Sequence, residues 1–175
     1  MTDIRDIPRH RELSYSRNNR SLTINYDFDL GHIESEGETL EYTLTQYATL
    51  TEKVIVKIQF PEPQNTFRCN VPTFGITYTV DYGPLNQTEN LRRITDVVRV
   101  LRGFHQLRTL EISLSLDIED FSRIACVAPF FDLRGRCQQW SMRYKRGRHG
   151  NYIYIGPGSP LYTRLERQNN TGMFD

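Results

Sequence analysis

The sequence predicts an α+β fold, with a mixed, largely antiparallel β-sheet and two main helices packed on one face of it. Several segments alternate apolar and polar residues, which is typical of strands with one buried face. One segment, 91–101, instead repeats its apolar residues every three or four positions, as an amphipathic helix does. Because strands alternate with helices only in the second half, we expect an antiparallel meander first and at least one parallel pair later.

The chain is long enough for one ordinary domain. It has 175 residues, of which 38% are hydrophobic, so a single filled core is expected. The two ends are polar and aperiodic. We therefore predict a flexible N-terminal arm at 1–20, a single domain at 21–165 and a flexible tail at 166–175.

The first half reads mainly as strands. Residues 21–29 alternate cleanly, and 54–60, 66–71 and 74–82 are further expected strands. Residues 39–47 fit two patterns, because Leu40, Tyr42 and Leu44 alternate while Leu40, Leu44 and Tyr47 have helical spacing. Three threonines in this segment favour the strand, since β-branched residues lose rotamer freedom in a helix.

The clearest periodicity lies at 87–116. The apolar stripe of the helix consists of Leu91, Ile94, Val97, Val98 and Leu101. Gly103 is placed to close this helix. Beyond it, Leu110, Ile112, Leu114 and Leu116 alternate with polar residues. The sequence thus predicts a buried unit of one helix followed by one strand.

A second helix, a hairpin and a last helical turn are expected to follow. Ile118 to about Phe130 reads as a helix whose length Pro129 limits. The segment 138–145 alternates and should pair with 151–155 as a hairpin. A single helical turn is expected from Pro160.

The sequence carries no recognisable catalytic pattern. The four histidines, at 10, 32, 105 and 149, lie apart from one another, and metal-binding and nucleotide-binding motifs are absent. The carboxylates at 117, 119 and 120 fit the start of a helix. We therefore expect no catalytic, cofactor-binding or metal-binding residue, no cofactor and no enzyme activity.

Three cysteines, at 69, 126 and 137, form no paired motif, which favours reduced thiols and a cytoplasmic or nuclear location. No apolar run approaches the roughly 20 residues that span a bilayer, so no membrane partner is expected. Arg134 and Arg136 flank Cys137, which predicts a lowered pKa for its thiol.

Charge distribution gives the best indication of a contact surface. Residues 21–52 contain no lysine or arginine, whereas 134–148 contain no acid. Basic and aromatic side chains together can bind single-stranded RNA by phosphate contact and stacking. Pairing with the acidic half, self-association and a merely solvated hairpin are the alternatives, and Trp140 and Tyr144 are expected on the core face. The candidate contact residues are Arg134, Arg136, Arg143, Lys145, Arg146, Arg148, Tyr152 and Tyr154.

Three segments resemble a known class of proteins. QNTFRC (64–69), LRGFHQLRTLEISLSL (101–116) and APFFDLRG (128–135) are similar to the region beyond the F-box in uncharacterised F-box-like, leucine-rich proteins of filamentous fungi. The resemblance implies an interaction domain and transfers no functional residue. Because no F-box helices are expected before residue 20, it does not carry over a role in ubiquitin ligation.

The sequence therefore predicts a non-catalytic protein-interaction module with an unknown protein partner. The first alternative is an RNA-binding domain that uses the basic and aromatic hairpin at 134–154. The second is an enzyme of unrecognised type.

Overall fold

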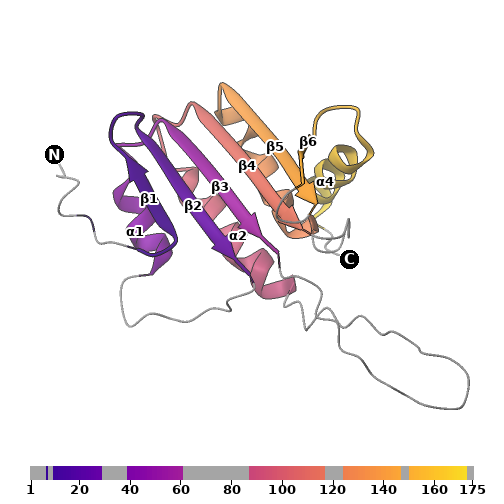
Figure 1. Cartoon of the computed structure of the whole chain (residues 1–175), viewed down its shortest axis with the longest axis horizontal. Coiled ribbons are helices and arrows are strands. Elements are labelled where there is room, and N and C mark those ends of the chain that lie inside the picture. Colours follow the sequence, from indigo (N-terminus) through magenta and orange to yellow (C-terminus); the bar gives the residue numbers. More distant parts are fainter. Residues whose placement is uncertain are drawn as a thin grey trace, which may run out of the picture.

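In the described part of the chain, six strands form one sheet, and their order in the sheet is their order in the chain (Figure 1). The computed structural model describes residues 7, 10–28, 39–60, 87–116, 124–146 and 150–172. The expected strands at 66–71 and 74–82 lie outside these residues. The strands are β1 (Leu13–Ser16), β2 (Ser21–Asp27), β3 (Lys53–Gln59), β4 (Thr109–Leu116), β5 (Gln139–Arg146) and β6 (Tyr152–Tyr154).

The directions of the strands correct one part of the expected fold. The α+β class and the mixed sheet are confirmed, and the hairpin of β5 and β6 is antiparallel as predicted. However, β2–β3, β3–β4 and β4–β5 are all parallel, and only the two outer pairs are antiparallel. The expectations of a largely antiparallel sheet and of a meander in the first half are therefore wrong.

The physical reason lies between β2 and β3, where the expected strand at 39–47 is a helix, α1 (Leu40–Gln46). Thr39 caps it, because its hydroxyl oxygen accepts a hydrogen bond from the N–H of Tyr42 at 3.3 Å. Leu40, Leu44 and Tyr47 are all buried, so the helical spacing places them in the core. Capping and burial outweigh the low helix propensity of threonine, and the connection can cross over to a parallel strand.

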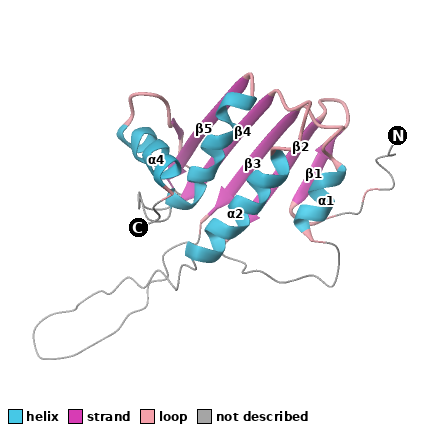
Figure 2. Cartoon of the chain, turned by 180° about the vertical axis from the view of Figure 1, so that it is seen from behind, coloured by secondary structure: helices cyan, strands magenta, loops and turns pink. Residues whose placement is uncertain are grey.

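The helices lie on one face of the sheet, as predicted (Figure 2). After α1 come α2 (Gln87–Leu101), the 3-10 helix η2 (Ala125–Arg136) and α4 (Pro160–Thr171). The α-helix expected at 118–130 is, in its described part, this 3-10 helix, which continues past Pro129. Proline has no N–H to donate within an α-helix, and 3-10 turns are used in such tight segments.

The helix α4 corrects two expectations at the C-terminal end. It runs for 12 residues rather than one turn, and it continues beyond 166, where a flexible tail was expected. Ser159 caps its start by accepting from the N–H of Tyr162 at 3.2 Å. Gly172 ends it with φ at 63°, the left-handed conformation that glycine adopts readily.

The unit at 87–116 forms the centre of the core, as the periodicity predicts. Ile94, Val97, Val98 and Leu101 of α2 and Leu110, Ile112 and Leu114 of β4 are all buried. Leu91, at the start of the stripe, is only partly buried against this cluster. The helix and the strand with the clearest periodicity in the sequence therefore both contribute to the same core cluster.

The N-terminal segment is more ordered than expected. Leu13–Ser16, within the expected arm, forms β1 and pairs antiparallel with β2. Just before it, Glu12 accepts a hydrogen bond from Arg93 of α2 at 2.9 Å, and both side chains are largely buried. The prediction of a flexible arm is wrong for this part, because the pairing and the ion pair hold it against the domain.

Candidate functional site

The face of the sheet opposite the helices, here called the open face, is seen in Figure 1. Strand alternation brings the buried apolar residues to the helix side and leaves polar side chains on the open face. Lys57, Ser113 and Arg143 occupy one register row across β3, β4 and β5. Lys53 of β3 forms a diagonal ion pair at 2.6 Å with Glu111 of β4, which lies on the same face two residues further along β4 than the register partner of Lys53.

Four candidate contact residues come together at one end of the open face: Arg143 and Lys145 of β5, with Tyr152 and Tyr154 of β6. We call them the β5–β6 patch. Arg143 is in register with Tyr154, and Lys145 with Tyr152. The guanidinium carbon of Arg143 lies 4.4 Å from the ring centroid of Tyr152, and the Lys145 amine lies 5.7 Å from it. These are cation–π distances.

The neighbouring strand β4 fixes the position of this patch. Nε of Arg143 donates a hydrogen bond to the hydroxyl oxygen of Ser113 at 3.0 Å. Ser113 is itself buried in β4, an inner strand of the sheet. The tyrosines are nevertheless accessible, with Tyr152 47% and Tyr154 59% exposed. The patch therefore offers aromatic and cationic groups in a held arrangement.

The remaining candidate residues do not join the patch. Arg134 donates to the hydroxyl oxygen of Tyr162 and pairs with Glu166 at 2.5 Å, both on α4 on the helix side. Arg136 ends η2 and donates to the carbonyl oxygen of Arg102 at 3.4 Å. Arg146 is exposed at the last position of β5, and Arg148 lies outside the described residues.

Trp140 and Tyr144 lie on the core side of β5, as the alternation predicts. Nε1 of Trp140 donates to the carbonyl oxygen of Phe130 at 3.1 Å, and the Trp140 ring packs tilted against Phe131. Tyr144 is buried. Among the described residues, the exposed aromatic rings on this hairpin are therefore those of Tyr152 and Tyr154 of β6.

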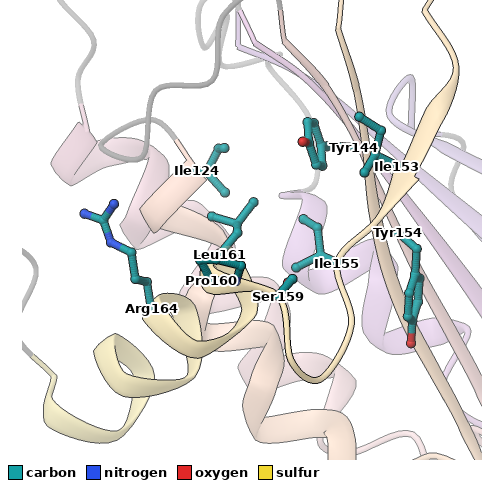
Figure 3. A pocket seen from close by; sticks show the side chains of 9 residues that line it. All are labelled: Ile124, Tyr144, Ile153, Tyr154, Ile155, Ser159, Pro160, Leu161 and Arg164. Carbon is teal, nitrogen blue, oxygen red and sulfur yellow. The ribbon is translucent and has the colours of Figure 1, made fainter.

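An apolar cavity beside β6 is the feature that the sequence did not reveal. It lies between β6 and the start of α4 (Figure 3). Its volume is about 350 Å³. Its lining includes Ile124, Tyr144, Ile153, Ile155 and Leu161. Ile153 is 46% exposed although it points to the core side of the hairpin. The alternation of residues 151–155 indicates on which face of the sheet Ile153 lies, but it does not predict the cavity next to this residue.

The thiols differ from the sequence-based expectation. Burial raises the pKa of Cys137, so the prediction that its neighbouring arginines lower it is wrong. Those two side chains are engaged by Glu166 and by the Arg102 carbonyl group instead. Burial also raises the pKa of Cys126 to about 12. Both groups therefore stay protonated near neutral pH and are poor nucleophiles.

The described ranges contain no group of three or more His, Cys, Asp or Glu side chains that could hold a metal ion. None of the helices within those ranges has the length and apolar character needed to cross a bilayer. Comparisons with models of protein families, with curated proteins and with solved structures find no significant match to this chain.

Proposed function

We propose that this chain is a non-catalytic protein-interaction module that binds a protein partner through the β5–β6 patch. One observation carries the proposal. Four large hydrophobic side chains are exposed among the described residues, and three of them are the consecutive residues Tyr152, Ile153 and Tyr154. Tyrosine and arginine are enriched at the centres of protein interfaces, where aromatic anchors supply much of the affinity.

The arrangement of the sheet supports the same proposal. The described strands follow one another in chain order and the described helices lie on one face, so none of these helices covers the other face; repeat proteins bind partners on comparable surfaces. The resemblance to leucine-rich, F-box-like proteins also fits an interaction role, as an analogy of architecture. Reduced thiols favour a partner in the cytoplasm or nucleus.

The charge of the patch favours an acidic partner. Arg143 and Lys145 belong to it, and Lys57 is exposed in the same register row of the open face. A surface with this excess of positive charge attracts negatively charged partners and raises their association rate.

Charge reversal in the patch is expected to abolish partner binding. Arg143→Glu combined with Lys145→Glu removes both cations, whereas Arg11→Glu combined with Arg167→Glu makes the same change in net charge at exposed positions elsewhere. Affinity capture from cells that express the protein should recover the same partner with the wild type and the control. The patch variant should recover at least about tenfold less of this partner. Equal recovery by all three proteins would contradict the proposal.

Single-stranded RNA is a second candidate, because the exposed ring of Tyr152 lies against two cations and the exposed Tyr154 is in register with one of them, Arg143. Base stacking on such rings contributes about 1–3 kcal/mol per base, and phosphate contacts make binding depend steeply on salt. Fluorescence titration with a short single-stranded RNA distinguishes this candidate. Binding that weakens with salt and needs both tyrosines supports it, and no binding at about 50 mM salt removes it.

A further inference from the structure

Among the described residues, no strand pairs with the outer edge of β6. β6 is the last of the described strands in the sheet, and within that part of the chain it pairs only with β5. The N–H of Ile155 donates to the carbonyl oxygen of Met142 at 2.8 Å. Since bonded and non-bonded pairs alternate in an antiparallel ladder, Ile153 bonds inward to Tyr144. The N–H and C=O groups of Tyr152 and Tyr154 therefore point outward, where a further strand would find them.

The surroundings of the outer edge of β6 differ between the helix side and the open face of the sheet. On the helix side, the apolar cavity adjoins Ile153 and separates β6 from Leu161 at the start of α4 (Figure 3). On the open face, the ring of Tyr152 lies against Arg143 and Lys145, and Tyr154 is in register with Arg143. A strand added here would meet an apolar site on one side and positive charge on the other.

We propose that β6 accepts a strand from a partner protein, an extended segment with one apolar residue between two acidic residues. Side chains of a strand alternate between the two faces of a sheet. The apolar residue opposite Ile153 would enter the cavity, and its two neighbours would lie on the open face near Arg143 and Lys145. Main-chain bonds to Tyr152 and Tyr154 would hold the segment, as in other cases of strand addition. This inference rests on the proposed function and specifies the partner.

A second copy of this chain fits the edge less well. Paired β6 strands would place an isoleucine in the cavity, but tyrosines rather than acids would then face Arg143 and Lys145. An exposed edge strand with apolar side chains is otherwise a risk for uncontrolled pairing. Charge complementarity therefore selects an acidic segment from another protein over self-association.

A synthetic peptide tests the inference directly. The probe is a fluorescently labelled, capped Ser-Glu-Ile-Glu-Ser peptide, and binding is measured by anisotropy together with the amide NMR shifts of the full-length protein. Three peptide controls replace the glutamates by lysines, replace the isoleucine by serine, or methylate the main-chain nitrogens. Each control should bind at least about tenfold more weakly, because it removes the charge, the anchor or the strand bonds respectively.

Variants of the protein separate the contribution of the main-chain hydrogen bonds of β6 from that of its side chains. Tyr154→Pro removes an outward N–H that β5 does not use, whereas Tyr154→Val removes the ring and keeps that N–H. Ile153→Asp places a charge at the cavity, and Tyr42→Asp changes the fourth exposed large hydrophobic residue, on α1, as a control. Proline at 154 should weaken binding about tenfold relative to valine, and Tyr42→Asp should leave binding unchanged.

The outcomes also distinguish this inference from the proposed function. Shifts at the amides of 152–154, with the expected order of controls, support strand addition. No binding of the Ser-Glu-Ile-Glu-Ser peptide, combined with loss of the cellular partner in the charge-reversal variant, overturns strand addition and leaves the patch intact. No peptide binding and no effect of charge reversal overturn both. Concentration-dependent dimers that Ile153→Asp dissolves would assign the edge to a second copy and contradict the inference.

Discussion

The variant Val98→Asp is expected to be unfolded. Val98 is 2% exposed on the face of α2 that packs on the sheet, within the central cluster of the core. An unpaired carboxylate there loses its hydration, and the cost of several kcal/mol is comparable to the roughly 5–15 kcal/mol that stabilises a whole domain. Far-UV circular dichroism and urea titration should show no cooperative transition.

The neighbouring position provides the control for this variant. Arg99 has a side chain that is 70% exposed and pairs with Asp96 on the surface of α2. Arg99→Ala keeps good helix propensity and should change the free energy of unfolding by less than about 1 kcal/mol. A Val98→Asp protein with the urea midpoint of the wild type would show that α2 does not pack on the sheet in this way.

Glu12→Ala is expected to destabilise the domain by about 3–5 kcal/mol, because it leaves the charge of Arg93 buried without its partner. The side chains are only 8% exposed for Arg93 and 12% for Glu12. The Arg93 guanidinium carbon also lies 5.0 Å from the ring centroid of Tyr26, which cannot replace a carboxylate. Urea denaturation measures the loss.

An exposed ion pair serves as the control for this variant, and a double variant tests the cause of the destabilisation. Glu89→Ala breaks the pair with Arg92, whose side chains are 32% and 60% exposed, and should cost less than about 1 kcal/mol. Replacing Glu12 by Leu and Arg93 by Met together should cost less than Glu12→Ala alone, since no buried charge remains. A Glu12→Ala effect as small as that of Glu89→Ala would show that Arg93 is well hydrated.

The sequence predicts best those helices and strands in which one periodic pattern continues over many residues. The helix at 87–101 and the strand at 109–116 follow from about thirty residues of consistent pattern. The segment at 39–47 is too short to separate two periods, and its outcome depends on the Thr39 cap and the burial of Tyr47. That one element decides whether β2 and β3 are parallel, so the relative direction of these two strands could not be predicted either.

The candidate site shows the same limit. Sequence order correctly places Arg143, Lys145, Tyr152 and Tyr154 in one hairpin, because a short antiparallel connection fixes which side chains share a face. It cannot show that Arg134 turns toward α4, since that depends on where η2 packs. The cavity beside β6 depends equally on how α4 packs, and α4 was expected to be a single turn.

The identity of sheet order and chain order has a consequence for how such a protein can change. In the described sheet, each strand is bonded only to the strands that come before and after it in strand order, although paired residues such as Lys53 and Thr109 lie far apart in the sequence. If a duplicated strand-and-helix unit were inserted between β3 and β4, the new strand would pair in parallel with both of them and so replace the β3–β4 pairing. Gain or loss of such a unit would therefore leave the antiparallel pairs β1–β2 and β5–β6 unchanged at the two edges of the sheet.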